Sequence, residues 1–262
     1  MSNKLNFSEL TLVARNIAII AGHEIMKFYS PNISYRNKND QSPVTEADEA
    51  SDKIITSELK STFPEIKVIS EESFDENNID QTHLSDELFW LVDPLDGTKE
   101  FISGNGEFTV NIALIKQGKP LLGVIYIPYQ KYCYVGEIGS GAVIWNEEED
   151  PKIISARTPP FKGPVVLASR SHLNSRTEEW IRLSKPSAII NAGSALKFAL
   201  LAKGEADLYP RFSPTMEWDT AAGHAILLAA GGSISLLDGQ ELAYGKKSFL
   251  NPEFIGRGKP TE

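Results

Sequence analysis

The sequence is poor in the residues on which several enzyme classes depend. Among its 262 residues there are one cysteine, Cys133, and four histidines. A single cysteine excludes both an intramolecular disulfide and a cysteine-based zinc site. The histidines lack the spacing of a two-histidine zinc helix, and no phosphate-binding Walker loop is present. Nucleophilic sets built on serine or cysteine with histidine also have no local signature here. Carboxylates are therefore the main candidates for carrying chemistry.

Positive charge and long apolar runs are scarce as well. Lysine and arginine number 26 against 35 acidic residues, which gives a net charge of −9. A nucleic-acid groove needs a basic surface, so we expect no nucleic-acid partner. No apolar run approaches the ~20 residues of a membrane span, so no membrane insertion is expected. Peripheral association with the inner face of the cell membrane stays open. If the substrate is anionic, metal ions must supply the positive charge that the protein lacks.

The overall composition is ordinary for a globular protein. Hydrophobic residues make up 41% and charged residues 23% of the chain, which is enough material for one large domain or two joined ones. The first residues lead into an amphipathic helix with apolar positions from Leu10 to Phe28, and they do not resemble a signal peptide. We therefore expect a cytoplasmic protein.

An apolar run, residues 88–92, ends in two carboxylates that stand close together in sequence. The run predicts a buried strand, and Pro94, which has no N–H to donate, is expected to stop the strand ladder. Such a segment places Asp93, the carbonyl of Leu95 and Asp96 around one point at a sheet edge. Oxygen ligands at this point suit a hard cation such as Mg²⁺. The alternative is an ordinary turn that caps a helix.

The next residues predict the start of a helix. Gly97 permits an unusual backbone angle, and Thr98 lies in the expected first turn. The backbone N–H groups of Gly97 and Thr98 would then point outward, ready for a phosphate.

Three further acids lie at similar positions. Glu71 follows a predicted strand at 67–70, and Asp48 falls in the first turn of a helix capped by Thr45. Asp219 opens an apolar helix. Taken singly, Asp48 complements a helix dipole and Asp219 is an N-cap. Taken together, four carboxylates at strand ends and a helix start, those of Glu71, Asp93, Asp96 and Asp219, without a thiol or histidine cluster, indicate a phosphate site with several Mg²⁺ ions.

The pattern of elements predicts two joined halves. Strands at 108–115, 121–126, 132–135 and 141–145 extend an antiparallel sheet in the first half. In the second half, strands at 165–168, 188–190, 206–209 and 233–237 alternate with helices at 175–183, 195–202 and 221–230, and the strand at 233–237 is expected to be the last. The Pro- and Gly-rich crossing at 158–164 is the best boundary. We expect an N-terminal α+β half, 1–157, with most of the metal ligands, and a C-terminal α/β half, 158–262, with Asp219 and the specificity residues, acting as one functional unit.

Three separated motifs now resemble a known family. Glu71-Glu72, Trp90 to Thr98 and Trp218 to Gly223 are similar, in this order, to the signature of the inositol monophosphatase superfamily of lithium-sensitive, Mg²⁺-dependent phosphatases. The similarity runs from the first helix to about Gly239. Segments 169–172, 193–198 and 206–212 most resemble the CysQ branch of 3'(2'),5'-bisphosphate nucleotidases, which convert adenosine 3',5'-bisphosphate (PAP) to AMP.

The resemblance implies a fold and a set of site residues. The fold is the α/β (α+β) class, a layered αβαβα sandwich of the inositol monophosphatase and fructose-1,6-bisphosphatase type, with the site between the halves. About two or three Mg²⁺ ions are implied. Their implied ligands are Glu71, Asp93, the Leu95 carbonyl, Asp96 and Asp219. Thr98, with Glu71 or Asp48, is implied as the group that orients the attacking water.

The same resemblance implies the substrate contacts. Those at the scissile phosphate are Glu71, Leu95, Asp96, Gly97, Thr98 and Asp219. His172, Ser194, Lys197 and Arg211 match positions that contact the nucleotide and its second phosphate. As plain structural alternatives, Lys197 is a solvated helix residue and His172 a loop residue.

The function implied is hydrolysis of the 3'-phosphate of a small-molecule nucleotide bisphosphate by a metal-activated water, linked to sulfate assimilation. A rival within the enzyme class is an inositol monophosphatase or a sugar phosphatase, which would use the same metals. A rival of another class is a non-catalytic regulatory or binding protein on the same fold. The sequence leaves open the choice between a monomer and a homodimer.

Overall fold

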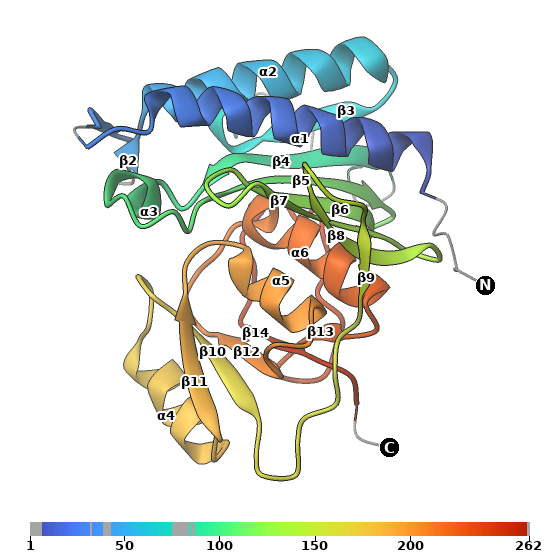
Figure 1. The fold of residues 1–262 in the computed structure, drawn as a ribbon. Helices are drawn as coiled ribbons and strands as arrows, with labels where there is room; N and C mark the ends of the chain where they lie inside the picture. The colour runs from blue at the N-terminus through green and yellow to red at the C-terminus, as the bar shows by residue number, and fades with distance from the viewer. Residues whose placement is uncertain (1–6, 32, 39–42, 75–83, 85–86, 261–262) are drawn as a thin grey trace.

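The computed structural model describes residues 7–31, 33–38, 43–74, 84 and 87–260, arranged in αβαβα layers (Figure 1). The outer helices are α1 (Glu9–Phe28) and α2 (Glu46–Thr62), the central ones α5 (Leu196–Ala202) and α6 (Glu217–Ala229), and α4 (Ser175–Leu183) covers the far side. One sheet lies between the outer and the central helices, and a second lies between the central helices and α4. The predicted layered fold is confirmed. None of the described helices is both long and apolar enough to cross a membrane.

The first sheet is seven-stranded and belongs to the N-terminal half. Its order is β3 (Lys67–Ser70), β4 (Leu88–Asp96), β5 (Thr109–Lys116), β6 (Lys119–Ile127), β7 (Tyr132–Glu137), β8 (Gly141–Asn146) and β9 (Lys152–Ile154). Strands β3 and β4 pair in parallel, and every later pair is antiparallel, as predicted. The edge strand β9 was not predicted, because its run is too short to stand out.

The buried strand at the centre of the predictions lies inside this sheet and faces two cores. Side chains alternate across a strand, so Phe89 and Leu91 join the core shared with the central helices. Trp90 and Val92 join the core under α1 and α2. Burial on both faces explains why this run is continuously apolar and not alternating.

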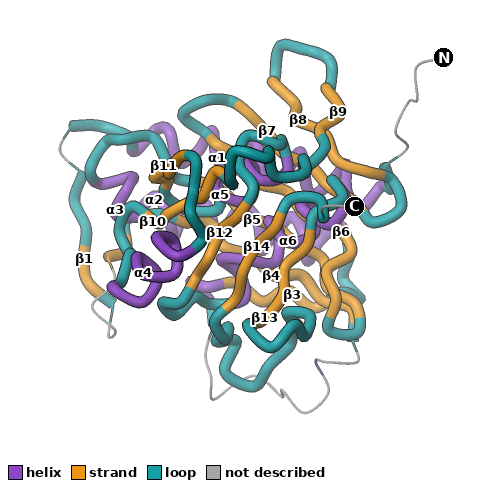
Figure 2. The backbone as a smooth tube through the Cα atoms, turned by 90° about the horizontal axis from the view of Figure 1, so that it is seen from below, coloured by secondary structure: helices purple, strands orange, loops and turns teal. Residues whose placement is uncertain are grey.

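The second sheet is five-stranded and lies below the first in Figure 1, so its strands are nearer the viewer in Figure 2, which is seen from below. Its order is β11 (Ala188–Ala192), β10 (Val165–Ser169), β12 (Leu208–Arg211), β14 (Phe254–Arg257) and β13 (Ser233–Leu236). Strands β10, β11 and β12 are parallel, whereas β14 runs antiparallel to both of its neighbours. The prediction that 233–237 is the last strand is wrong, because the chain returns and inserts β14 between β12 and β13. A short pair, β1 (Arg36–Asn37) and β2 (Pro43–Val44), lies outside both sheets.

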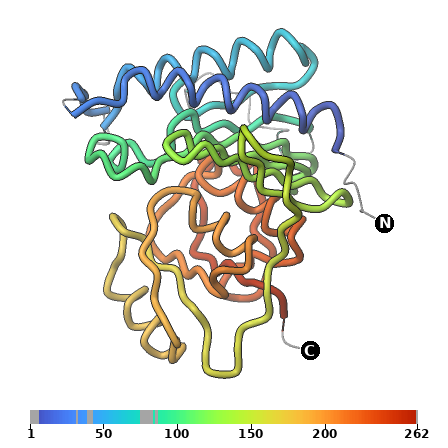
Figure 3. The backbone as a smooth tube through the Cα atoms, in the orientation of Figure 1, coloured from blue at the N-terminus to red at the C-terminus, as the bar shows by residue number. Residues whose placement is uncertain are grey.

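The chain passes from one sheet to the other between β9 and β10, along the predicted boundary segment (Figure 3). The division of the chain into two halves stays a prediction, since helix α6 from the C-terminal part packs closely on the first sheet. A Cβ atom at Gly123 of β6 would lie 2.2 Å from the carbonyl oxygen of Ala222. Only glycine allows the two backbones to approach this closely. Helix α6 also contacts β4, so its first turn lies near the end of that strand.

Candidate active site

A cleft of about 240 Å³ opens where the end of β4 meets the start of α6 and the ends of β10 and β12. Residues of both halves line it. They include Glu71, Asp93, Leu95, Asp96, Gly97, Thr98, His172, Ser194, Lys197, Arg211 and Asp219. Of the residues singled out from the sequence, Asp48 lies just behind this lining. The structure therefore brings the predicted set together.

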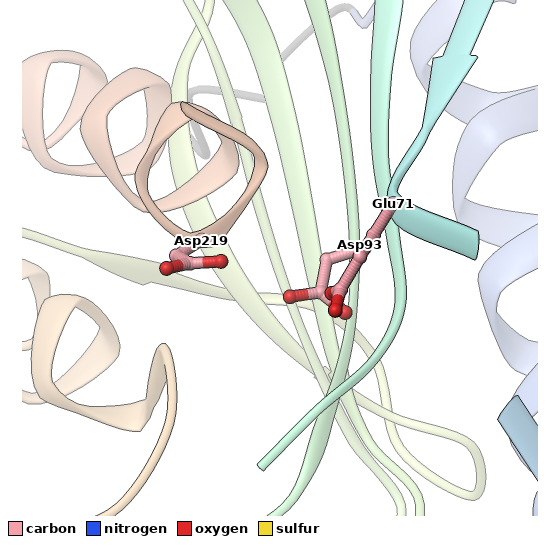
Figure 4. A group of neighbouring side chains, drawn as sticks. All are labelled: Glu71, Asp93 and Asp219. Atoms are coloured by element: carbon pink, nitrogen blue, oxygen red, sulfur yellow. The ribbon is translucent and has the colours of Figure 1, made fainter. Parts of the chain in front are cut away.

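Three acids meet at one point of the cleft (Figure 4). Glu71 begins a short 3₁₀ helix, η1 (Glu71–Ser73), directly after β3; Asp93 belongs to β4, and Asp219 to the first turn of α6. One carboxylate oxygen from each lies within 4.8 Å of the other two. Asp219 lies on α6 and faces the other two acids, which lie on η1 and β4.

The backbone around Asp93 corrects one expectation. Strand β4 continues to Asp96, so Pro94 does not end it. Pairing with β5 is broken between Asp93 and Asp96, where the register shifts. A bulge at this place accommodates the missing N–H of Pro94 while the strand resumes. The Pro94 carbonyl accepts a hydrogen bond of 2.7 Å from Ser51 Oγ of α2, which holds the bulge against that helix.

The electrostatics of the three acids are those of residues that could hold a cation. Burial, followed by repulsion from Glu71, Asp96 and Asp219, raises the pKa of Asp93 well above its usual value. Burial and the charges of Asp96 and Glu71 likewise raise the pKa of Asp219. Like charges held this close oppose ionisation unless a cation lies among them. Oxygen donors alone, in this number, fit a hard divalent cation.

Asp96 takes a different environment from the other acids. One of its oxygens, Oδ2, accepts hydrogen bonds from Ala195 N at 2.7 Å and from Asn111 Nδ2 at 3.2 Å. Burial raises its pKa, and the charge of Lys197 opposes that rise. Among the described residues, Asp96 is not part of the group within 4.8 Å. The sequence therefore predicted its place in the cleft but not its partners in the other half.

Thr98 and Asp48 are joined by a hydrogen bond. Thr98 Oγ1 donates to Asp48 Oδ1 at 3.0 Å, and Asp48 Oδ2 accepts from Thr45 N at 2.8 Å and from Thr45 Oγ1 at 2.6 Å. Thr45 is the N-cap of α2, as predicted, and Asp48 completes its capping box. Burial raises the pKa of Asp48, and the hydrogen bonds from Thr45 and Thr98 counter part of that rise. Asp48 thus has a structural role at the cap and a second contact at the cleft.

The turn after Asp96 has the backbone that the sequence predicts. Gly97 adopts a φ of 90°, in the left-handed region, and serves as the N-cap of α3 (Thr98–Ile102). Thr98 Oγ1 also lies 3.5 Å from the Leu95 carbonyl oxygen. Glycine at this position is what lets the chain turn directly from strand to helix.

Cationic groups line another part of the same cleft. Lys197 is buried and donates to the carbonyls of Ala192 at 3.2 Å and Ser194 at 2.6 Å, and burial lowers its pKa to about 8. Arg211 ends β12 and donates to the carbonyls of Ser213 and Pro214. Burial and the charge of Arg211 lower the pKa of His172. Lys197 is 3% exposed and is therefore not the solvated helix residue of the alternative, whereas His172 does lie in a loop, between β10 and α4, and is exposed.

Ser194 joins the turn before α5 to the first sheet. It adopts a φ of 49°, uncommon for a residue with a side chain. Its Oγ lies 2.7 Å from Thr109 Oγ1 of β5, and the following N–H, that of Ala195, reaches Asp96. The strained turn is therefore tied to the first sheet at two points.

Sequence reasoning missed one cation beside the acids. Lys38 Nζ donates to Glu71 Oε1 at 2.8 Å and to Glu72 Oε1 at 2.6 Å. Glu72 is largely removed from solvent, and this burial is the main cause that raises its pKa to about 7. Lys38 stands in a polar stretch without periodicity, so only the tertiary structure reveals this contact.

A layered αβαβα fold with carboxylates gathered in a cleft defines a class, that of the metal-dependent phosphatases. Residues 6–259 match the inositol monophosphatase family, and the chain belongs to this family. The 3'(2'),5'-bisphosphate nucleotidase CysQ of Salmonella typhimurium is 46% identical over 246 residues, covering 92% of this chain and 95% of that protein. The CysQ nucleotidase of Buchnera aphidicola is 42% identical over 245 residues, covering 91% of this chain and 89% of that protein.

Solved structures agree with this membership. The crystal structure of CysQ from Bacteroides thetaiotaomicron, a bacterial member of the inositol monophosphatase family, superposes with a TM-score of 0.83 at 38% identity. The match covers 98% of this chain and 99% of the Bacteroides protein. The extragenic suppressor protein SuhB from Bartonella henselae superposes with a TM-score of 0.76 at 29% identity, and the match covers 95% of this chain and 94% of SuhB.

Proposed function

We propose that the protein is a Mg²⁺-dependent 3'(2'),5'-bisphosphate nucleotidase that hydrolyses adenosine 3',5'-bisphosphate to AMP and phosphate. One observation carries this proposal beyond the family. The cleft holds an acidic cluster around Glu71, Asp93 and Asp219, and it is also lined by His172, Lys197 and Arg211. A substrate with two phosphates suits such a cleft, because one phosphate can meet metal ions and the other can meet side-chain cations.

The acids are proposed to hold the metal. Glu71, Asp93 and Asp219 would bind it directly, and the Leu95 carbonyl and Asp96 would complete the ligands on the same side of the cleft. When bound, a divalent cation supplies Lewis acidity, which acidifies water and neutralises the charge of the phosphoryl group. Asp96 has Oδ2 hydrogen-bonded to Ala195 and Asn111, so its other oxygen is the one proposed for this role.

Thr98 and Asp48 are proposed to orient the attacking water. The Thr98 hydroxyl hydrogen is directed to Asp48 Oδ1 at 3.0 Å, so the lone pairs of Thr98 Oγ1 can accept a hydrogen bond from water. This geometry favours Asp48 over Glu71 as the partner of Thr98. The N–H groups of Gly97 and Thr98 are proposed to contact the scissile phosphate. The residues then act mainly by positioning and charge stabilisation.

The second phosphate is proposed to meet Arg211 and Lys197, with His172 and Ser194 beside the nucleotide. The guanidinium of Arg211 uses Nε and Nη2 for the carbonyls of Ser213 and Pro214. These contacts fix the plane of the fork, which suits recognition of a phosphate. Arg211 is 8% exposed and Lys197 3% exposed, so a phosphate bound beside them would gain from weak solvent screening.

A phosphate-release panel tests the proposal. The purified protein, with Mg²⁺, receives adenosine 3',5'-bisphosphate, inositol 1-phosphate or fructose 1,6-bisphosphate at equal concentration. We expect the highest kcat/KM for the nucleotide, and chromatography should identify AMP as the product. Activity should vanish with excess EDTA and should not depend on Zn²⁺. Preference for either of the other two substrates would support the inositol or sugar phosphatase alternative, and no release from any of them would support the non-catalytic one.

A further inference from the structure

The first turn of α6, which carries Asp219, is held from behind by residues 244–251, here called the clamp segment. Glu217, the first residue of α6, is fully buried at 0% exposure. Its carboxylate accepts from the backbone N–H groups of Gly245 at 2.6 Å and Lys246 at 2.9 Å. Lys246 Nζ lies 2.6 Å from the same carboxylate. A buried charge with donors on both oxygens is fixed in direction and costly to disturb.

Asn251 holds the same turn at a second point. Its N–H donates to the Thr215 carbonyl at 2.8 Å, and its Nδ2 donates to the Met216 carbonyl at 2.8 Å. Nδ2 also lies 3.0 Å from Thr220 Oγ1. In return, Glu217 N donates to the Phe249 carbonyl at 2.7 Å. The residues on both sides of Asp219 are thus bonded to the clamp segment.

These bonds reach Asp219 through one further contact. The backbone N–H of Met216 donates to Asp219 Oδ2 at 2.9 Å. Met216 is the N-cap of α6, and its own carbonyl is held by Asn251. The N–H that bonds Asp219 belongs to the peptide between Thr215 and Met216, and the carbonyl of that peptide accepts from Asn251 N–H. The Asn251 side chain holds the carbonyl of the next peptide. The direction of the Asp219 carboxylate is therefore set by a turn that the clamp segment fixes on both sides of Met216.

Asp219 needs such support because its neighbours repel it. Its carboxylate meets those of Asp93 and Glu71 within 4.8 Å, and like charges held this close repel one another. Without restraint, Asp219 would relieve this repulsion by turning away, and any metal would first have to restore the geometry. Outer partners of metal ligands commonly govern affinity in this way.

We propose that Glu217 and Asn251 are positioning residues that preorganise Asp219 for the divalent cation, so that the clamp segment sets the metal affinity of the enzyme. This inference rests on the proposed function, in which Asp219 is a metal ligand. Neither side chain is proposed to touch the substrate or the metal.

The test compares two buried carboxylates. Glu217→Gln removes the charge and leaves one of the two backbone N–H groups facing an amide N–H₂. Asp207→Asn is the matched control, because Asp207 is also 0% exposed and accepts from a backbone N–H, that of Val165 at 2.7 Å, and from Arg157 at 2.8 Å. Asp207 does not line the cleft. Calorimetric titration of the metal-free proteins with Mg²⁺ reads affinity without any substrate.

Both variants should melt lower than the wild type in EDTA, since each loses a buried charged acceptor. Only Glu217→Gln should bind Mg²⁺ more weakly, by about 10- to 100-fold, and need correspondingly more Mg²⁺ for half-maximal activity. Its kcat at saturating Mg²⁺ should change much less. Asn251→Ala should weaken Mg²⁺ binding in the same direction, and it decides the question if Glu217→Gln does not fold.

Unchanged Mg²⁺ affinity in Glu217→Gln and Asn251→Ala would overturn the inference, as would an equal loss in Asp207→Asn. The titration also separates this inference from the substrate assignment. A wild type that binds Mg²⁺ but releases no phosphate from the nucleotide would refute the proposed substrate and leave the result on the clamp segment standing.

Discussion

Replacing Asp93 by asparagine should stabilise the metal-free protein while it abolishes catalysis. The side chain is 1% exposed and shares its site with Glu71 and Asp219. Asparagine keeps the shape, and its Oδ1 can still accept the hydrogen bond of 3.2 Å from the Leu95 N–H. The substitution therefore removes mainly the charge.

The size of the effect follows from Coulomb's law. Two unit charges no more than 4.8 Å apart repel by about 3.5 kcal/mol or more at an effective dielectric constant of about 20. The raised pKa values of Asp93 and Asp219 mean that protonation already relieves part of this repulsion. We expect a net gain of about 1–3 kcal/mol in the free energy of unfolding, which for a chain of this size raises Tm by roughly 3–10 °C.

The assay is thermal melting in EDTA and in Mg²⁺, at pH 7.5, beside the rate of phosphate release. Asp93→Asn should melt above the wild type in EDTA, gain little from Mg²⁺, and lose about 100-fold or more in kcat. Asp96→Asn is the contrasting variant. Asp96 accepts from Ala195 N–H and is attracted by Lys197, so this variant should melt lower in EDTA. If Asp93→Asn also melts lower in EDTA, the acids do not repel one another as the structure implies.

Three further predictions follow from other parts of the molecule. Arg211→Ala should lower kcat/KM for adenosine 3',5'-bisphosphate by about 10- to 150-fold, the scale of one hydrogen bond to a charged group, and hardly affect a small monophosphate; equal losses on both would contradict its role. Thr98→Val removes the hydroxyl hydrogen-bonded to Asp48 and should lower kcat by about 100-fold or more with unchanged Mg²⁺ binding by calorimetry, whereas unchanged kcat would exclude it from the reaction. Burial lowers the pKa of His224 to about 3, so between about pH 6.5 and pH 3 only the unfolded chain takes up this proton. Between pH 7 and pH 5 the wild type should therefore lose about 2 kcal/mol more of its free energy of unfolding than His224→Gln. Urea denaturation at both pH values measures this difference, and an equal loss in the two proteins would refute the prediction.

Much of the fold could be predicted because the local sequence carries it. The continuous apolar run in β4 belongs to a strand buried on both faces, and Thr45 and Gly97 stand where the helices begin. What failed depends on pairing between distant segments. Strand β14 is short and contains Gly256, so only its insertion between β12 and β13 makes it a strand. Pro94 stays inside β4 because β5 tolerates a register shift.

The sequence was enough to predict which residues form the site, but not which residues they are hydrogen-bonded to. Glu71, Asp93 and Asp219 were chosen as acids at strand ends and a helix start, and the motif order supplied the rest. No feature of the neighbouring sequence indicates that Lys38 donates a hydrogen bond to Glu71, or that Glu217 accepts one from Gly245 N–H. Such contacts join segments far apart in sequence, and neither periodicity nor a capping rule detects them.

The central claim is that Glu71, Asp93 and Asp219 together hold the catalytic cation, and anomalous diffraction tests it most directly. Crystals of the wild type would be grown metal-free and soaked in Mn²⁺, a substitute for Mg²⁺ that scatters anomalously. The account predicts the strongest anomalous peak between these carboxylates, and its loss in an isomorphous crystal of Asp93→Asn. Strong peaks only elsewhere on the protein, with these carboxylates empty at saturating Mn²⁺, would contradict it.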